Sequence, residues 1–381
     1  MLAFAFVLCC FLVLYPYVVY PVLLKGLSLF RSWKILVSEA TPGMTLLISA
    51  FNEEDVIAEK VENALALDYP KENLEIIVVS DHSTDRTDEI VKRYQDRGVK
   101  LLTLPVRQGK TAGLNEAVRQ AQGEIVVFSD ADSLYKPDAL RIIASSLAGD
   151  ASVGLVTGST DYASRGEGRM VVTTSMYTRF ERFLKRYESR LGSCVGADGA
   201  LFGMRKDLYE PLQQDDINDF VLPLRVVRQG YRVVLREDLI CFEAPAVDER
   251  GEFRRQARIT NRTLRALFRH ATLMNVFIYP LFSFELISHK LLKLSAPLFM
   301  LSLLPLNLLL LAQGPVFAAM LALQVAGYGF CLVRGWRERS GKKPVSAGFL
   351  YHFVMVNVSM LVGWTKFLTG QKSVIWSPQR Q

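Results

Sequence analysis

Strand and helix patterns alternate along residues 45–160, and this alternation most strongly limits the fold that the chain can adopt. Continuous apolar runs such as Ile76–Val79 predict strands that are buried on both faces, with helical stretches between them. The predicted strands are Thr45–Phe51, Glu75–Asp81, Lys100–Pro105, Glu124–Asp130 and Val153–Thr160, and the predicted helices are Glu54–Leu67, Asp85–Arg97, Lys110–Gln122 and Pro137–Leu147. This pattern predicts an α/β domain with a mostly parallel sheet covered by helices on both sides.

Four other segments are apolar over a length that can cross a lipid bilayer. Half of the 381 residues are hydrophobic, which is a high share for a soluble enzyme. The predicted spans are Leu2–Leu24, Leu294–Ala312, Pro315–Val333 and Ser346–Leu368. The first lacks a basic segment before it and a small-residue cleavage site after it, so we expect an uncleaved anchor. The shorter segment Leu273–Ser288 contains Glu285 and is expected at the membrane interface.

Basic residues beside these segments predict their orientation. Lys25, Arg31 and Lys34 follow the first span, and the basic segment Arg334–Lys343 separates the last two. The positive-inside rule places these residues in the cytoplasm and the N-terminus outside. Because the basic residues cluster here, we assign the formal net charge of +7 to the membrane surface and expect no nucleic acid partner. We therefore expect an integral protein of the cytoplasmic (inner) membrane with its catalytic domain in the cytoplasm.

An arginine stripe is predicted between the catalytic region and the C-terminal spans. The stripe recurs every three or four residues in the predicted helix Phe253–Arg269 and consists of Arg254, Arg258, Arg262, Arg265 and Arg269. Arginines on one helix face beside apolar residues are typical of a helix in the lipid headgroup layer. The predicted parts are the anchor at residues 1–24, the catalytic domain at 40–250, interfacial helices at 251–290 and transmembrane helices at 291–368.

Two aspartates follow a buried strand, one residue apart. Side chains two residues apart on an extended chain share a face, so Asp130 and Asp132 are expected to point the same way. Two carboxylates at a strand end suit a hard divalent cation that keeps coordination positions for phosphate oxygens. The sequence therefore suggests an enzyme that uses a nucleotide-activated donor.

Polar residues, and no GxGxxG motif, follow the first two predicted strands. The first strand leads into Asn52 and Glu53, and the second ends at Asp81. Strand ends in an open parallel sheet line the ligand crevice, where a carboxylate can accept a hydrogen bond from a nucleotide base. The alternative is that Asn52, Ser83 and Asp85 only cap helices.

Four motifs in register closely resemble family 2 glycosyltransferases with the GT-A fold. They read SAFNEE, VVSDHSTDRT, QGKTAGLN and FSDAD, in this order. The resemblance implies that Asp81 contacts the nucleotide base, and that Asp130 and Asp132 form a DxD motif that contacts the ribose and a Mg²⁺ or Mn²⁺ ion. The positions implied to bind the nucleotide are Asn52, Glu53, Asp81, Lys110, Asp130 and Arg258.

The resemblance continues into an acidic stretch at residues 215–225. Transfer needs a base that takes the proton from the acceptor hydroxyl. The register of the family's acidic motif places this base at Asp219, ahead of Asp216 or Asp215. The alternative is an acidic turn on the surface.

The loop Gly196–Arg205 resembles the acceptor side of the family's site. Small residues such as Gly199 would let a sugar approach the backbone closely. Asp198 would either bind that sugar or hold the loop, and the sequence leaves both open.

Processive members, such as cellulose and hyaluronan synthases, carry QxxRW where this chain reads Arg255-Gln256-Ala257-Arg258-Ile259. The arginine is kept at Arg258, which is expected to meet the diphosphate. Arg255 and Ile259 replace the glutamine and the tryptophan, which disfavours synthesis of a long polymer. His289 lies ahead of the C-terminal spans and is expected to be an interfacial polar residue.

These observations predict a membrane-embedded, metal-dependent, inverting glycosyltransferase. Its donor would be a nucleotide diphosphate sugar, with UDP favoured, and its acceptor a lipid-linked or other saccharide. One alternative is a processive exopolysaccharide synthase that also exports its polymer. A second alternative is a non-catalytic, nucleotide-sensing subunit of a polysaccharide export complex. Membrane lipids are further expected partners.

Overall fold

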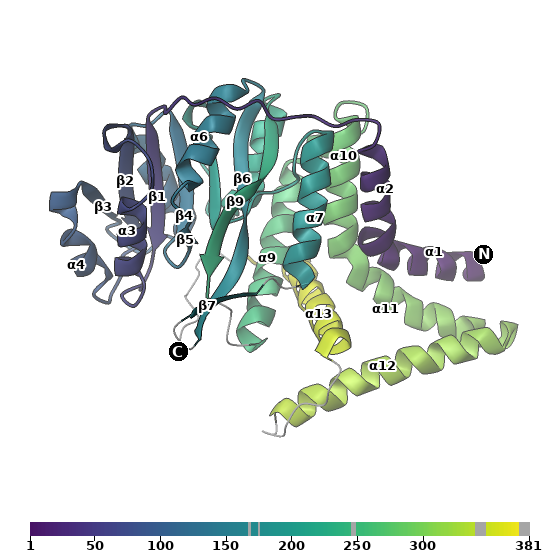
Figure 1. Ribbon diagram of the computed structural model, residues 1–381. Helices are drawn as coiled ribbons and strands as arrows, with labels where there is room; N and C mark the ends of the chain where they lie inside the picture. The colour runs from purple at the N-terminus through teal and green to yellow at the C-terminus, as the bar shows by residue number, and fades with distance from the viewer. Residues whose placement is uncertain (167–168, 174–175, 245–248, 340–347, 373–381) are drawn as a thin grey trace. The chain divides into compact units, whose positions relative to one another are not determined.

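The computed structural model describes residues 1–166, 169–173, 176–244, 249–339 and 348–372 (Figure 1). The chain divides into two units. The sheet unit comprises Leu24–Val247 and Arg265–Glu285, and the helical unit comprises Met1–Leu23, Asp248–Leu264 and Leu286–Lys372. The two units are described separately below.

A nine-stranded sheet forms the centre of the sheet unit, in the order β3-β2-β1-β4-β8-β6-β9-β5, with β7 paired to β6. The strands are β1 (Met44–Ala50), β2 (Leu74–Ser80), β3 (Val99–Thr103), β4 (Ile125–Asp130), β5 (Leu134–Tyr135), β6 (Val153–Gly166), β7 (Arg169–Thr173), β8 (Leu201–Arg205) and β9 (Arg232–Glu243). The first four strands pair in parallel, as predicted, and β6 is parallel to β9. Strand β8 runs antiparallel to β4 and β6, so the α/β class is confirmed with a mixed sheet.

Helices cover both faces of this sheet (Figure 1). They are α3 (Ile57–Leu65), α4 (Thr87–Lys92), α5 (Lys110–Gln120), α6 (Ala139–Gly149), α7 (Met176–Leu191) and α8 (Asn218–Arg228). Ile48 of β1 belongs to one buried cluster with Val61 of α3 and Leu140 of α6. On the other face, a Cβ added to Gly113 of α5 would lie 2.8 Å from Val79 Cγ1, so α5 rests directly on β2.

Two helices begin or end differently from the prediction, because local contacts compete with the helix. Helix α3 starts at Ile57 and not at Glu54, since the preceding turn is bonded to the neighbouring loop. The predicted helix Asp85–Arg97 is interrupted after Lys92, and Gly98 follows with a positive φ of 86°. Apolar periodicity locates a helix but does not show where side-chain hydrogen bonds replace its first turn.

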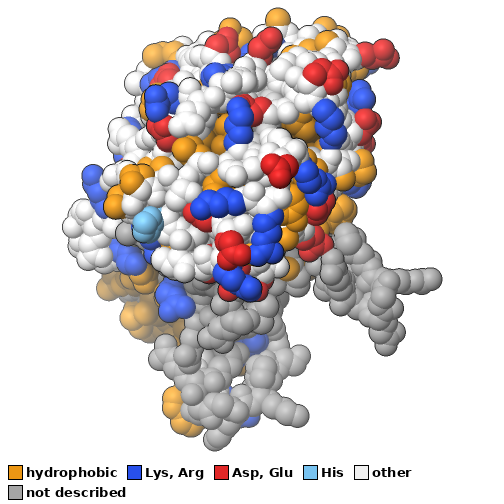
Figure 2. Space-filling model, turned by 90° about the vertical axis from the view of Figure 1, so that its left-hand side faces the viewer, with side chains coloured by type: hydrophobic (Ala, Val, Ile, Leu, Met, Phe, Trp, Pro, Cys, Tyr) orange, Lys and Arg blue, Asp and Glu red, His pale blue; other side chains and the backbone are white. Residues whose placement is uncertain are grey.

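Acidic and basic side chains are interspersed on the face of the sheet unit seen in Figure 2. Exposed ion pairs of the sheet unit include Arg93 with Glu89 and Arg97 with Glu62. Exposed pairs of this kind contribute little to stability, about 0–1 kcal/mol each. Their charges offset one another, so neither sign dominates this face.

The helical unit contains the apolar helices at both ends of the chain. They are α1 (Leu2–Leu14), α2 (Tyr20–Leu27), α11 (Lys293–Leu310), α12 (Pro315–Arg339) and α13 (Gly348–Leu368), with α2 continuing into the sheet unit. Trp364 Nε1 donates a hydrogen bond to Leu294 O at 2.7 Å, and Phe6 packs edge-on against Phe317. The unit also holds most of α9 (Glu249–Arg269).

Among the described residues, three helical runs are long and apolar enough to cross a membrane: Leu2–Leu27, Pro280–Gln313 and Pro315–Arg337. They contain the first three predicted spans. The second run starts ahead of Leu294, because α10 (Pro280–Leu286) continues through a π-helical stretch into α11. The fourth predicted span forms α13 but is not among the three runs, so the count of four stays a prediction.

Candidate active site

Asn52 ties the loop after β1 to the loop after β2. Its φ of 55° lies in the left-handed region, which asparagine tolerates better than most residues. Its Oδ1 accepts a hydrogen bond from Thr84 N at 2.8 Å, and its Nδ2 donates to Thr84 Oγ1 at 3.1 Å. The side chain therefore holds the loop in place at the edge where a nucleotide was predicted.

Three further bonds join the same two loops. Glu53 N donates to Thr87 Oγ1 at 2.8 Å, and Glu54 N donates to Asp85 Oδ2 at 3.0 Å. Asp85 Oδ1 also accepts a bond from Thr87 N at 2.9 Å, so Asp85 has the capping role that the sequence left open. Ser83 likewise accepts a bond from Asn52 N. Glu53 itself is buried.

Asp81 orients the segment ahead of α5. Its Oδ1 accepts a hydrogen bond from Gln108 N at 2.8 Å, and its Oδ2 accepts one from Gly109 N at 2.9 Å. Gly109 has a φ of 91°, a conformation that favours glycine. Asp81 thereby fixes the backbone just before Lys110. Gly109 N also donates to Asp81 Oδ1 at 3.1 Å, and Arg107 Nε lies 4.0 Å from Oδ2. A carboxylate has about four acceptor positions, so these three bonds leave one for a further donor.

Three carboxylates converge at the end of β4. Oxygens of Asp130, Asp132 and Glu243 lie within 4.8 Å of one another. The strand ends at Asp130, so Asp132 lies in a turn, and the predicted alternation along an extended chain is not what brings the two together. Glu243 is the last residue of β9 and was not predicted, because the sequence does not show that β9 pairs with β5 beside this turn. Three carboxylates are a donor set that suits Mg²⁺ or Mn²⁺.

Lys110 is the first residue of α5 and donates a hydrogen bond to Asp130 Oδ1. Burial opposes its charged form, but the carboxylate of Asp130 outweighs burial and raises the pKa of Lys110. The predicted neighbourhood of Lys110 and Asp130 is therefore present. Their ion pair places a fixed positive charge beside the acidic cluster.

Asp219 lies in the first turn of α8, opposite the predicted acceptor loop. A Cβ added to Gly199 would lie 2.9 Å from Asp219 Oδ2, and Ala197 N donates to Asp219 O at 2.7 Å. Asp219 Oδ1 is buried and has no hydrogen-bond partner among the described residues. The fold therefore brings Asp219 and Gly199 together. Their roles as base and acceptor contact stay predictions.

The environment of Asp219 favours its protonated form. Burial raises the pKa of Asp219, while Lys110 and Lys185 act against this rise. Lys185 comes from α7, which the sequence did not connect with the site. A half-buried carboxyl with one buried oxygen and a raised pKa beside cations is a candidate for general acid–base chemistry.

Asp215 and Asp216 have different surroundings from Asp219. Both are buried, so the alternative of an acidic surface turn is wrong. Asp216 forms ion pairs with Arg225 and Arg269, and Asp215 Oδ1 accepts a bond from Arg269 at 2.9 Å. Arg269 ends α9 and was expected in the headgroup layer. Periodicity shows that arginines share a face, but not what that face meets.

Asp198 holds its own loop. It accepts hydrogen bonds from Thr160 N at 2.9 Å, from Thr160 Oγ1 at 2.7 Å and from Ala200 N at 3.2 Å. These contacts show that Asp198 holds the loop, which is one of the two roles that the sequence left open. Binding of an acceptor sugar by Asp198 remains a prediction.

Arg258 lies in the part of α9 that belongs to the helical unit. Burial, with help from the neighbouring Arg262 and Arg255, lowers the pKa of Arg258 to about 10. Its contact with a diphosphate stays a prediction. His289 is buried in the same unit, with its ring 6.3 Å from that of Tyr20.

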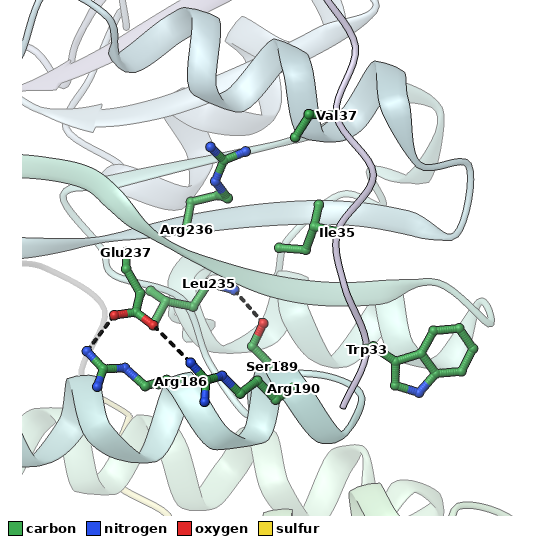
Figure 3. A pocket seen from close by; sticks show the side chains of 9 residues that line it. All are labelled: Trp33, Ile35, Val37, Arg186, Ser189, Arg190, Leu235, Arg236 and Glu237. Atoms are coloured by element: carbon green, nitrogen blue, oxygen red, sulfur yellow. Dashed lines mark hydrogen bonds and ion pairs between the residues drawn. The ribbon is translucent and has the colours of Figure 1, made fainter. Parts of the chain in front are cut away.

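A cavity of about 340 Å³ elsewhere in the sheet unit is lined by arginines (Figure 3). Arg186 and Arg190 both face Glu237, and Arg236 is paired with Asp238 at 2.6 Å. Glu237 is six residues before Glu243 on β9, which is up to roughly 20 Å along a strand. The cavity is therefore separate from the acidic cluster, and its guanidinium groups already have carboxylate partners.

Residues 45–212 match the family described as Glycosyl transferase family 2. A poly-β-1,6-N-acetyl-D-glucosamine synthase of Staphylococcus aureus (strain MSSA476) is 25% identical over 205 residues, which are 52% of this chain and 49% of that protein. The enzyme of the same name from Staphylococcus epidermidis is 29% identical over 165 residues, or 43% of this chain and 40% of that protein. The chain thus spans about half the length of the curated relatives it matches, or less.

A solved structure resembles nearly the whole chain. It is a mannosyltransferase from Pyrobaculum calidifontis in complex with GDP-Man and Mn²⁺. The TM-score is 0.74 at 23% sequence identity, and the match covers 98% of this chain and 100% of that chain. This likeness shows a shared fold.

Proposed function

We propose the reaction that this site carries out, starting from the match of residues 45–212 to Glycosyl transferase family 2 and from the GT-A fold. The protein transfers a sugar from a nucleotide diphosphate sugar to a lipid-linked or other saccharide acceptor, with inversion at the anomeric carbon. One observation carries the proposal: the buried, hydrogen-bond-free oxygen of Asp219 lies opposite Gly199, and Lys110 faces both Asp219 and the acidic cluster.

The donor nucleotide lies along the carboxyl ends of β1 and β2. Asp81 accepts a hydrogen bond from the base with its remaining acceptor position, and Asn52 and Glu53 complete this side of the pocket. We propose uridine diphosphate as the carrier. The archaeal neighbour binds GDP-Man, so guanosine donors belong in any test.

Asp130, Asp132 and Glu243 would hold a Mg²⁺ or Mn²⁺ ion. Such an ion, when bound, neutralises charge on the departing diphosphate. Lys110 supplies a further positive charge on the same side, and Arg258 is proposed to add another from α9. The Asp130 carboxylate also orients the Lys110 ammonium through their hydrogen bond.

Asp219 removes the proton from the attacking acceptor hydroxyl. A free hydroxyl is a poor nucleophile at neutral pH, and a positioned base accelerates such a step by about 10²–10⁴-fold. The proton moves to a carboxylate oxygen of Asp219, whose raised pKa makes it a stronger base than an exposed aspartate. Gly199 leaves space beside this oxygen for the acceptor.

The catalytic domain faces the cytoplasm. Support comes from Lys25, Arg31 and Lys34 after the first apolar helix and from the basic residues after Val333. A cysteine introduced at Lys342, within the basic segment Arg334–Lys343, should resist membrane-impermeant thiol reagents in intact cells and react after the membrane is opened. Rapid labelling in intact cells would reverse the proposed orientation.

The decisive experiment offers radiolabelled UDP- and GDP-sugars to membranes that contain the protein or its Asp219→Asn variant. We expect one donor to label a lipid or short saccharide fraction only with the parent protein. Label in a long polymer would favour the alternative of a processive polysaccharide synthase. The relatives are named as synthases of a polysaccharide. Binding of a donor without any transfer would favour the non-catalytic subunit and contradict the proposal.

A further inference from the structure

Lys60 is a lysine in a position where a positive charge is costly. It lies on α3 and is fully buried, with 0% exposure. Its neighbours on the same helix face are Ile57, Val61 and Ala64, which all belong to the hydrophobic core. A lysine at a core position needs a partner for its ammonium group.

The partner is the turn that carries the acidic cluster. Lys60 Nζ donates a hydrogen bond to Ser133 O, lies 3.4 Å from Ser133 Oγ and sits 3.7 Å from the centroid of the Tyr135 ring. Ser133 Oγ in turn donates to Asp130 O at 2.9 Å. Lys60 thus braces the turn from Asp130 to Ser133, in which Asp132 lies.

The charges around Lys60 are those of the cluster. Burial lowers the pKa of Lys60 to about 7, and Cys241, Asp130, Asp132 and Glu243 act against this fall. Lys110 is a second cation at the cluster, through its bond to Asp130. Two lysines therefore lie near the three carboxylates and offset part of their negative charge.

We propose that Lys60 is a positioning residue and internal counter-cation, which holds the three carboxylates together without a metal and makes tight metal binding depend on the donor diphosphate. The ammonium repels a divalent cation, and the two phosphates of the donor restore the attraction. The proposal rests on the proposed function, because it takes the cluster as the metal site of the transfer reaction. It explains why an otherwise apolar helix face carries a lysine here.

The test is a titration of the full-length protein in detergent with Mn²⁺, alone and with UDP or GDP, at a pH below about 7 where Lys60 is charged. Lys60→Met should bind Mn²⁺ alone roughly ten-fold or more tightly than the parent, because a nearby positive charge is removed. The gain in Mn²⁺ affinity on adding the nucleotide should shrink. Lys60→Arg, which keeps the charge, should restore the weak binding of Mn²⁺ alone.

Lys206→Met is the matched control. Lys206 also donates from Nζ to a backbone carbonyl, that of Ala121, but none of its described contacts involves the cluster. It should bind Mn²⁺ as the parent does. A folded Lys60→Met variant with unchanged or weaker affinity for Mn²⁺ overturns the proposal.

Measurements on the parent protein and on a second variant decide the matter if Lys60→Met does not fold. Equal Mn²⁺ affinity with and without both nucleotides overturns the proposal. Otherwise Lys60→Gln, which removes the charge but keeps a hydrogen-bond donor, replaces Lys60→Met in the same titration, and unchanged Mn²⁺ affinity in that variant overturns the proposal. Failure of the proposed function has a different signature: no sugar is transferred from any donor, whatever the Mn²⁺ titrations show.

Discussion

The two sides of the candidate site differ in how their polar groups are satisfied. After β1 and β2, Asn52 and Asp85 are hydrogen-bonded to neighbouring loop residues. At the start of α8, Asp219 has a buried oxygen with no hydrogen-bond partner among the described residues. At the end of β4, three carboxylates crowd together. A satisfied network fixes a shape, whereas an unsatisfied buried group is costly and marks chemistry.

The same contrast recurs within the acidic stretch ahead of α8. Asp216 is neutralised by two arginines, but Asp219, three residues later, faces lysines without a hydrogen bond. Spacing in the sequence cannot separate these two aspartates. Their partners predict that Asp216 supports the structure and Asp219 supports catalysis. Variants of Asp216 should therefore change stability, and variants of Asp219 should change the rate of transfer.

The largest effect is expected for Asp219→Asn. This change keeps the size of the side chain but removes its basicity, so transfer should fall by about 10²–10⁴-fold while donor binding is nearly unchanged. Rates of sugar transfer and a donor-binding isotherm measure the two quantities. Transfer within a few-fold of the parent would place the base elsewhere.

Asp132→Ala should weaken the metal site. Loss of one of the three carboxylates is expected to reduce Mn²⁺ affinity by at least about 10–100-fold, with matching loss of metal-dependent transfer. Mn²⁺ titrations of the variant and activity assays of the parent in EDTA test this. Full activity of the parent in EDTA would contradict a metal-dependent reaction.

Asp216→Asn should act on stability and not on the reacting groups. Its charge is buried against Arg225, and breaking such a pair costs on the order of 3–5 kcal/mol. Thermal unfolding measures the loss. Glu89→Gln, which breaks the exposed pair with Arg93, is the control and should change stability by less than about 1 kcal/mol. A normal unfolding temperature with no transfer would make Asp216 the base.

The pH dependence of transfer should report the environment of Asp219. The base acts when deprotonated, so the rate should fall as the pH falls through its pKa, which burial raises above the ordinary value of 3.8. The positive charges of Lys110 and Lys185 lower the pKa of Asp219, whereas the negative charges of Asp130 and Asp198 raise it. Lys185→Met should therefore move the acid limb of the rate profile to higher pH. If the acid limb of the pH–rate profile stays where it is in Lys185→Met, Lys185 does not influence the pKa of the base.

The smallest effect is expected at Asn52. Asn52→Ala loses the bonds to Thr84 and places an alanine at a positive φ, which should cost about 1–2 kcal/mol of stability. Asn52→Gly tolerates that φ and should cost less. Thermal unfolding ranks the two variants, and a donor KM raised far beyond a few-fold in Asn52→Gly would show a direct nucleotide contact.

Local pattern was enough for much of this protein. Continuous apolar runs located β1 to β4 to within one or two residues, because a strand covered on both faces must be apolar throughout. Motifs at the ends of β2 and β4 identified Asp81 and Asp130 as candidates, since parallel strands bring their carboxyl ends to one edge. Lys110 and Asp219 came from the resemblance to the family. Apolar length likewise located three helices that are able to span a membrane.

The tertiary structure alone decided which distant groups meet. Glu243 joins Asp130 because β9 pairs with β5, and Lys60 reaches Ser133 because α3 packs over the turn after β4. Arg269 separates Asp216 from Asp219 by pairing with the first and not the second. Periodicity reports which side chains share a face of one element. Burial, ion pairing and shifted pKa values depend on what another element places against that face, and that is settled only when the chain folds.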